Sequence, residues 1–95
     1  MLNGIAPKRA EVLWRSDIDA LVFTVEAHSA LCAVHRRAFR TLLRYDPEPK
    51  DCLRYFADAE PAFTAAAKAK IAERNIPTGV NFHLTSRDVA RKLVA

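Results

Sequence analysis

Apolar residues occupy every second position in three short stretches of the chain, at residues 21–26, 30–34 and 80–84. A period of two places successive side chains on opposite faces of a strand, so each stretch predicts a β-strand with one face toward a core. Residues 21–26 and 31–35, joined by a loop at 27–29, are expected to form an antiparallel hairpin.

A helical pattern occupies residues 50–75. Its apolar side chains recur at a spacing that places them on one stripe of a helix, interrupted only by Glu60. The stripe consists of Leu53, Phe56, Glu60, Phe63, Ala67 and Ile71. Pro61 lacks a backbone donor, so we expect the helix to kink there or to restart with Asp58 as its N-cap. Residues 75–79 (NIPTG) are typical of a helix end followed by a turn.

Residues 36–45 predict a shorter helix, which Asp46, Pro47 and Pro49 should end. A second interpretation makes residues 27–45 one continuous helix. Its inner side would then carry Leu31, Val34, Ala38 and Leu42. Short apolar runs fit a strand and a helix equally well, so periodicity alone leaves both interpretations open.

The ends of the chain add smaller elements. Residues 1–10 show no periodicity and are expected to be an irregular leader, while residues 11–15 predict a further edge strand with Trp14 over the rim of the core. Thr85 and Asp88 have the spacing of a capping box, which predicts a short terminal helix over residues 86–95. The whole is one α+β domain, residues 1–95, with an antiparallel sheet covered on one face by two helices, in the order (β)-β-β-α-α-β.

Specific residues within this order carry a family resemblance. The stretch ALVFTVEAHSALCAVHRRAFRTLL at residues 20–43 places Cys32 and Val34 in a Cys-x-[Ile/Val] strand, with Ala38 and Phe39 at the following helix start. The stretch CLRYFADAEPAFTAAAKAKI at residues 52–71 has an x-Leu-x-x-Phe start and an alanine-rich end.

On these residues the chain, from about residue 14 to residue 84, resembles the bacterial family catalogued as domain of unknown function 1488. The resemblance implies a hairpin, a short helix, a longer helix and a final strand, and so favours a strand at residues 31–35. This chain departs from the family pattern in three ways. Its hairpin loop is shorter, His35 replaces a small residue before the first helix, and the terminal helix is additional. The resemblance implies no activity and no catalytic residues.

Composition narrows the class of protein. A content of 51% hydrophobic and 27% charged residues is ordinary for a globular domain, and the formal charge of +4 favours anionic partners only weakly. No apolar run approaches the roughly 18–20 residues that span a bilayer. Residues 1–10 do not have the pattern of a secretory signal, so the expected location is cytoplasmic and the expected state of Cys32 and Cys52 is reduced.

The sharpest candidate site is a basic stripe on the predicted helix at residues 36–45. At about 100° per residue its four arginines lie within about a third of the helix circumference. They are Arg36, Arg37, Arg40 and Arg44. Arginine engages phosphate bidentately, so the stripe favours an anion or nucleic-acid contact. The alternative is a solvated face, or one that Asp46, Glu48 or Asp51 neutralises.

The outer face of the predicted sheet is the second candidate. Side chains at alternate positions point away from the core, and those expected to face a partner are Thr24, His35, Asn81 and His83. His35 and His83 are expected near one another across strands, but Cys32 should point to the opposite face. The pattern therefore predicts no metal site.

Catalytic motifs are missing from the sequence. Its only glycines are Gly4 and Gly79, so it has no phosphate-cradling loop, and no nucleophile stands beside a recognisable base. We therefore expect no enzyme activity, no catalytic residue and no cofactor. The leading hypothesis is an interaction or accessory protein that binds a partner protein or a second copy through its sheet face or edge. The alternative is a weak nucleic-acid binder that uses the four arginines.

Overall fold

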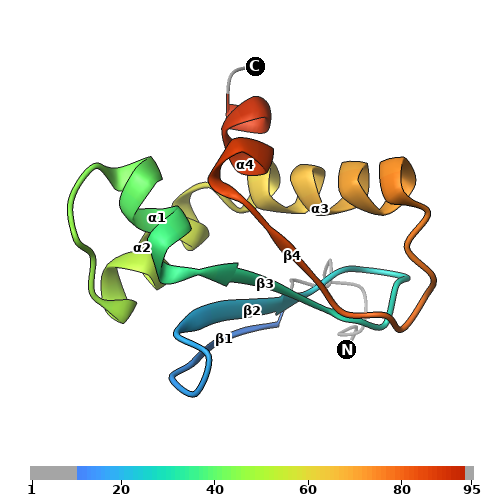
Figure 1. Ribbon diagram of the computed structural model, residues 1–95, viewed down its shortest axis with the longest axis horizontal. Coiled ribbons are helices and arrows are strands. Elements are labelled where there is room, and N and C mark those ends of the chain that lie inside the picture. The colour runs from blue at the N-terminus through green and yellow to red at the C-terminus, as the bar shows by residue number, and fades with distance from the viewer. Residues whose placement is uncertain (1–10, 94–95) are drawn as a thin grey trace, which may run out of the picture.

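The computed structural model describes residues 11–93, and the predicted leader and the last two residues of the predicted terminal helix lie outside this range. A four-stranded sheet forms one layer, with the strands in the order β1-β2-β3-β4 (Figure 1). The strands are β1 (Val12–Arg15), β2 (Ala20–Thr24), β3 (Leu31–His35) and β4 (Phe82–Leu84). The fold class is α+β and the expected order of elements is confirmed.

The direction of β4 corrects the expectation of a purely antiparallel sheet. Strands β1, β2 and β3 pair antiparallel, whereas β4 runs parallel to β3, with Cys32 opposite Phe82 and Val34 opposite Leu84. Three helices separate β3 from β4, and the last of them is 15 residues long, about 22 Å of helix. This crossover returns the chain to the starting end of β3, which makes a parallel pair possible.

The structure distinguishes between the two interpretations of residues 27–45, a strand followed by a helix or one continuous helix. Ala27 and Ser29 have φ angles of 67° and 63°, which no continuous right-handed helix contains. Leu31–His35 is a strand paired along its whole length with β2. The single-helix interpretation of residues 27–45 is therefore wrong, and the hairpin is confirmed.

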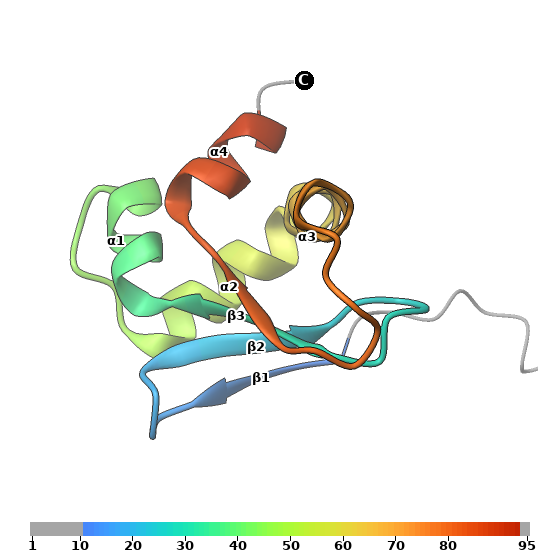
Figure 2. The same cartoon turned by 45° about the vertical axis from the view of Figure 1, so that its right-hand side comes forward.

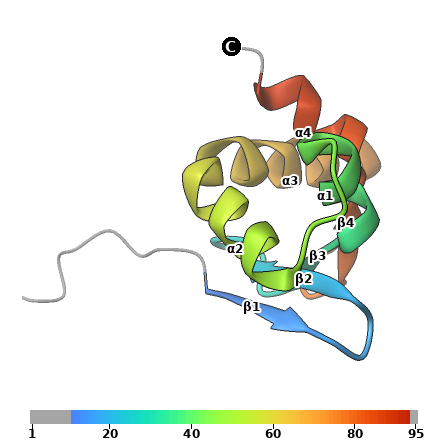
Figure 3. The same cartoon turned by 90° about the vertical axis from the view of Figure 1, so that its left-hand side faces the viewer.

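The helices of the described residues all lie on one side of the sheet (Figures 2 and 3). They are α1 (Arg36–Leu43), α2 (Pro49–Asp58), α3 (Glu60–Arg74) and α4 (Ser86–Leu93). Helix α1 is two residues shorter than predicted, because Arg44 adopts a left-handed conformation with φ 69° and donates its N–H to the carbonyl of Arg40. Helix α4 packs on α3 and α1, so the layer holds more than the two helices expected.

The prediction of a helix break at Pro61 is confirmed only in part. The helix restarts as predicted, but Ala59 is its N-cap, and Asp58 is the last residue of α2. The N–H of Ala59 closes α2 on the carbonyls of Tyr55 and Phe56, leaving Asp58 too early in the chain to cap α3. The prediction of Asp58 as N-cap is wrong.

The chain then turns as the sequence predicts. Asn75 ends α3 in the left-handed region, and Gly79 has a φ of 89° that favours glycine. Strand β4 is two residues shorter than expected: the Asn81 side chain, not its backbone, accepts the N–H of Leu31, and Val80 is 47% exposed. The capping box of α4 is confirmed: Thr85 N–H donates to Asp88 Oδ2 at 2.9 Å, and Asp88 N–H donates to Thr85 Oγ1 at 3.2 Å.

The core lies between the sheet and the helices and centres on Phe63. Its ring is fully buried and sits 5.0 Å from that of Phe56, 5.7 Å from Phe39 and 6.5 Å from Phe23. These separations suit offset and edge-on aromatic pairs, which add to the stabilisation from burial. Cys32 and Cys52 are free thiols buried in the same core, so the expectation of two unpaired cysteines is confirmed.

Candidate functional site

The four predicted residues of the outer sheet face separate into two groups. Thr24 Oγ1 accepts the N–H of Glu11 at 3.0 Å, and Asn81 Oδ1 accepts the N–H of Leu31 at 2.9 Å. These two side chains therefore join neighbouring backbone segments. His35 and His83 come together near the other end of the sheet, with their ring centroids 5.9 Å apart.

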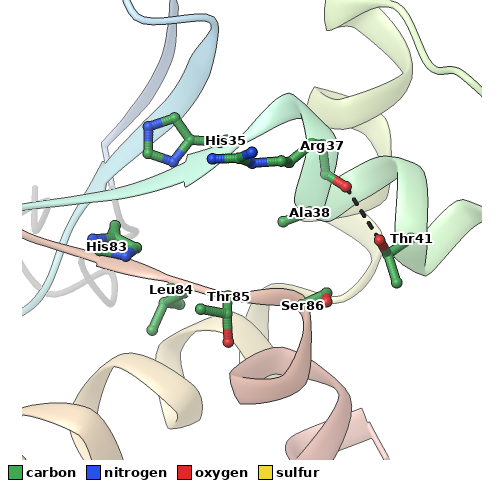
Figure 4. Close-up of a pocket in the computed structure, with 8 residues that line it drawn as sticks. All are labelled: His35, Arg37, Ala38, Thr41, His83, Leu84, Thr85 and Ser86. Atoms are coloured by element: carbon green, nitrogen blue, oxygen red, sulfur yellow. Dashed lines mark hydrogen bonds between the residues drawn. The ribbon is translucent and has the colours of Figure 1, made fainter.

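An open groove of about 410 Å³ lies between His35, His83 and the two helices that follow β3 and β4 (Figure 4). Arg37 and Thr41 border it from α1, and Ser86 from the start of α4. Ala38, Leu84 and Thr85 complete its lining. Thr41 Oγ1 donates to the carbonyl of Arg37 at 3.3 Å. Among residues 11–93 no three His, Cys, Asp or Glu side chains group as a metal site would require.

The charges around this groove are mostly positive. Partial burial, with the neighbouring charges of Lys70 and His35, lowers the pKa of His83 below its ordinary value of 6.5, although Asp88 acts in the opposite sense. Lys70 itself contacts Asp88 Oδ2 at 2.9 Å, and both side chains are largely buried. Arg37 is exposed and has no salt bridge in the part of the chain that the structure describes.

The arginine stripe is divided by its environment. Arg36 Nε lies 3.0 Å from Asp19 Oδ2, and an Nη atom lies 3.7 Å from Asp46 and 3.3 Å from the carbonyl of Pro47. Asp46 was an expected neutralising group, whereas Glu48 and Asp51 instead form the capping box of α2. Arg36 is thus engaged within the fold.

The other three arginines remain accessible. Arg37, Arg40 and Arg44 are exposed, and none has a salt bridge among the described residues. They lie three and four residues apart, on one side of α1 and at its end. The predicted anion contact is therefore reduced from four side chains to three.

The β1 margin of the sheet is a further candidate surface. No strand of residues 11–93 pairs with its outer side. Val12 is 40% exposed, Leu13 55%, and Ile18, in the turn that follows, 38%. Val22 points to the same outer face as its partner Leu13 but is only 4% exposed, so the accessible apolar surface is confined to the edge strand and the turn after it. An unprotected edge strand with apolar side chains is a site for strand addition.

His28 is a residue whose role sequence reasoning missed. It lies in the hairpin loop yet is only 5% exposed, with Nε2 3.2 Å from the carbonyl of Ile76 and its ring 5.7 Å from that of Phe82. Its carbonyl accepts the N–H of Gly79 at 2.8 Å. His28 therefore links the hairpin loop to the segment before β4, and its partner 48 residues away leaves no signal in the local sequence.

The two thiols are poor nucleophiles. Burial raises the pKa of Cys32 to about 12 and that of Cys52 to about 11, so neither forms a thiolate near neutral pH. Neither lies in the groove or at the β1 edge.

Searches against protein-family models, curated proteins and solved structures return no match for this chain. The resemblance to domain of unknown function 1488 therefore stays a prediction. Within residues 11–93, no helix has the length and apolar character that crossing a bilayer demands.

Proposed function

We propose that this protein is a non-catalytic interaction module that binds its partner by strand addition at β1, and that this partner is a second copy of the chain. The observation that carries the proposal is that no strand of residues 11–93 pairs with the outer side of β1, where Val12 and Leu13 are exposed. The buried free thiols suit a reducing compartment such as the cytoplasm, where we expect the module to act.

Hydrogen-bond alternation identifies the free backbone groups of β1. The N–H of Thr24 donates to the carbonyl of Glu11 at 3.0 Å, so the backbone groups of Glu11 face β2. Along an antiparallel strand these directions alternate, which turns the N–H and C=O groups of Val12 and Trp14 toward the open edge. A partner strand must therefore hydrogen-bond to these two residues.

One antiparallel register between two copies gives hydrogen-bond partners to the free backbone groups of both Val12 and Trp14. Val12 of one copy lies opposite Trp14 of the other, which makes two hydrogen-bonded pairs, and Leu13 faces its own equivalent on the two-fold axis. Val12 and Trp14 share the helix-covered face with Phe23 and Leu21, whereas Leu13 lies on the outer face with Val22. The pairing thus joins like faces and extends the sheet from four strands to eight.

Charge supports the same register. Glu11 of one copy lies opposite Arg15 of the other, on the same face as Leu13. Within its own copy, Arg15 also contacts the exposed Asp17, whose pKa is lowered by the hydrogen bond from the guanidinium. Arg15 would therefore lie between two carboxylates, those of Asp17 and of Glu11 from the other copy. Exposed ion pairs contribute little affinity, but they favour one register over another.

Disulfide trapping tests this register. Leu13→Cys places two thiols at a non-hydrogen-bonded pair, where the Cα atoms are about 4.5 Å apart and a disulfide can close. Mild oxidation should convert this variant to a covalent dimer, seen on a non-reducing gel. The native cysteines should not interfere, because both are fully buried.

Val12→Cys is the matched control. In the proposed register its Cα lies about 8–9 Å from its equivalent, too far for a bridge. Val80→Cys, exposed but away from β1, controls for random collision. Equal trapping of all three variants, or none of Leu13→Cys at concentrations where the protein scatters light as a dimer, would contradict the β1 pairing.

A weak nucleic-acid contact is the second candidate function, favoured by the accessible Arg37, Arg40 and Arg44. Binding to duplex DNA should weaken with salt, with a log–log slope of about −0.9 for each phosphate contacted. Replacing Arg40 and Arg44 with alanine should flatten that slope. An absence of binding at low salt would remove this candidate without touching the β1 proposal.

A further inference from the structure

The parallel pairing of β3 and β4 creates a shared edge that an antiparallel sheet would not. Both strands end at the same side of the sheet, and each continues directly into a helix: His35 precedes α1, and Leu84 and Thr85 precede α4. The groove of about 410 Å³ lies at this place (Figure 4). Ligand sites of sheets with parallel strands favour the region outside the carboxyl ends of the strands.

Four side chains with hydrogen-bond donors border the groove from four different elements. His35 comes from β3, Arg37 from α1, His83 from β4 and Ser86 from α4. Within residues 11–93 no hydrogen bond or salt bridge engages any of these four side chains. Their donors are therefore available to a ligand, and they approach it from several directions.

Among the residues that the structure describes, no carboxylate lines this groove, whereas Arg37 does. Asp88 at the start of α4 is bound to Lys70 and to the N–H of Thr85, and Asp19 in the turn before β2 is bound to Arg36. The first-turn N–H groups of α4 add a partial positive charge at the same side. Partial burial is the main cause that lowers the pKa of His83, and the charges of Lys70 and His35 act in the same sense, against that of Asp88.

We propose that this groove binds the phosphate group of a small organic phosphomonoester. A phosphate offers oxygens in several directions, which matches donors converging from four elements, whereas a planar carboxylate would engage fewer of them. The volume is within the roughly 300–1,000 Å³ of small-molecule sites and exceeds what inorganic phosphate alone would fill. The site is separate from β1, so it stands whether or not the chain pairs with itself.

A titration followed by NMR tests the proposal, with the imidazole resonances of His35 and His83 as reporters. Phenyl phosphate should shift both sets saturably in the millimolar range, and inorganic phosphate should do so more weakly. Benzoate, which has the same ring and a carboxylate, should bind weakest. Arg37→Ala should weaken phenyl phosphate binding by about tenfold or more, since it removes a charge-assisted hydrogen bond.

Arg54→Ala is the matched control, because Arg54 is exposed on α2 and its loss changes the net charge equally. His83→Gln provides a second variant that retains a donor but cannot become charged, and it should bind severalfold more weakly. Shifts that fail to saturate would overturn the proposal. So would equal weakening by Arg37→Ala and Arg54→Ala, or benzoate binding as tightly as phenyl phosphate.

Discussion

Leu13→Glu is the most direct perturbation of the proposed pairing between two β1 strands. Leu13 is 55% exposed in the single chain and would lose most of that exposure against its equivalent on the two-fold axis. Full burial of a leucine side chain contributes about 1.5–3 kcal/mol, so burying the exposed part contributes about 0.8–1.6 kcal/mol in each copy. The symmetric dimer loses this contribution twice, about 1.6–3.3 kcal/mol.

This loss corresponds to a dimer dissociation constant raised by about 15- to 250-fold. The two introduced carboxylates would face one another across a non-hydrogen-bonded pair, which adds repulsion and makes the estimate a lower bound. Sedimentation equilibrium over a dilution series measures the constant directly. Urea unfolding at a concentration where both proteins are monomeric should show stabilities within about 1 kcal/mol, since Leu13 is largely exposed.

Val80→Glu is the matched control, because Val80 is 47% exposed and lies outside all strands. It should leave the dimer dissociation constant unchanged. A Leu13→Glu protein that dimerises as tightly as the parent chain would refute the reasoning, as would a parent chain that stays monomeric at millimolar concentration.

Three further outcomes are expected of the fold. Phe63→Ala should lower the free energy of unfolding by about 3–5 kcal/mol in urea denaturation, and a loss below about 1 kcal/mol would contradict its central place in the core. Burial tends to raise the pKa of Asp88, but its hydrogen bonds with Thr85 and Lys70 lower it overall below 3.8. The ionised Asp88 therefore stabilises the fold above about pH 4, and this stabilisation is lost as the pH falls through the lowered pKa. Asp88→Asn should make the free energy of unfolding depend less on pH below about pH 4. An unchanged pH dependence would exclude a stabilising role of the Asp88 carboxylate. The buried thiols of Cys32 and Cys52 should resist a thiol reagent at pH 8 until the protein unfolds, and rapid reaction of the native protein would count against their burial.

Tertiary contacts determine which polar side chains of the groove and of the arginine stripe remain available to a ligand. Four arginines looked equivalent on the predicted helix, yet Arg36 alone meets Asp19, which lies 17 residues away in the turn before β2. Similarly, Thr24 and Asn81 were grouped with the histidines by alternation, but both are engaged by backbone N–H groups of other segments. Side-chain type and spacing identified the candidates; their partners decided which of them stay available.

The sequence by itself determined the local elements of this protein. Alternation predicted the hairpin, and the restart at Pro61, the end of α3 at Asn75 and the capping box of Thr85 and Asp88 all depend on residues a few positions apart. Such features follow from backbone sterics and short-range hydrogen bonds, which a one-dimensional pattern records.

Alternation alone had predicted that His35 and His83 lie near one another across strands, as they do. Only the tertiary structure decided the direction of β4, the burial of His28 and the packing of α4 against α1. Each depends on where α3 returns the chain, and hence on packing between residues about 50 positions apart. A strand has the same alternation whichever way it runs, so its pattern carries no information on parallel or antiparallel pairing. The edge where a phosphate is proposed to bind exists because the crossover and the packing of the core make β4 parallel to β3.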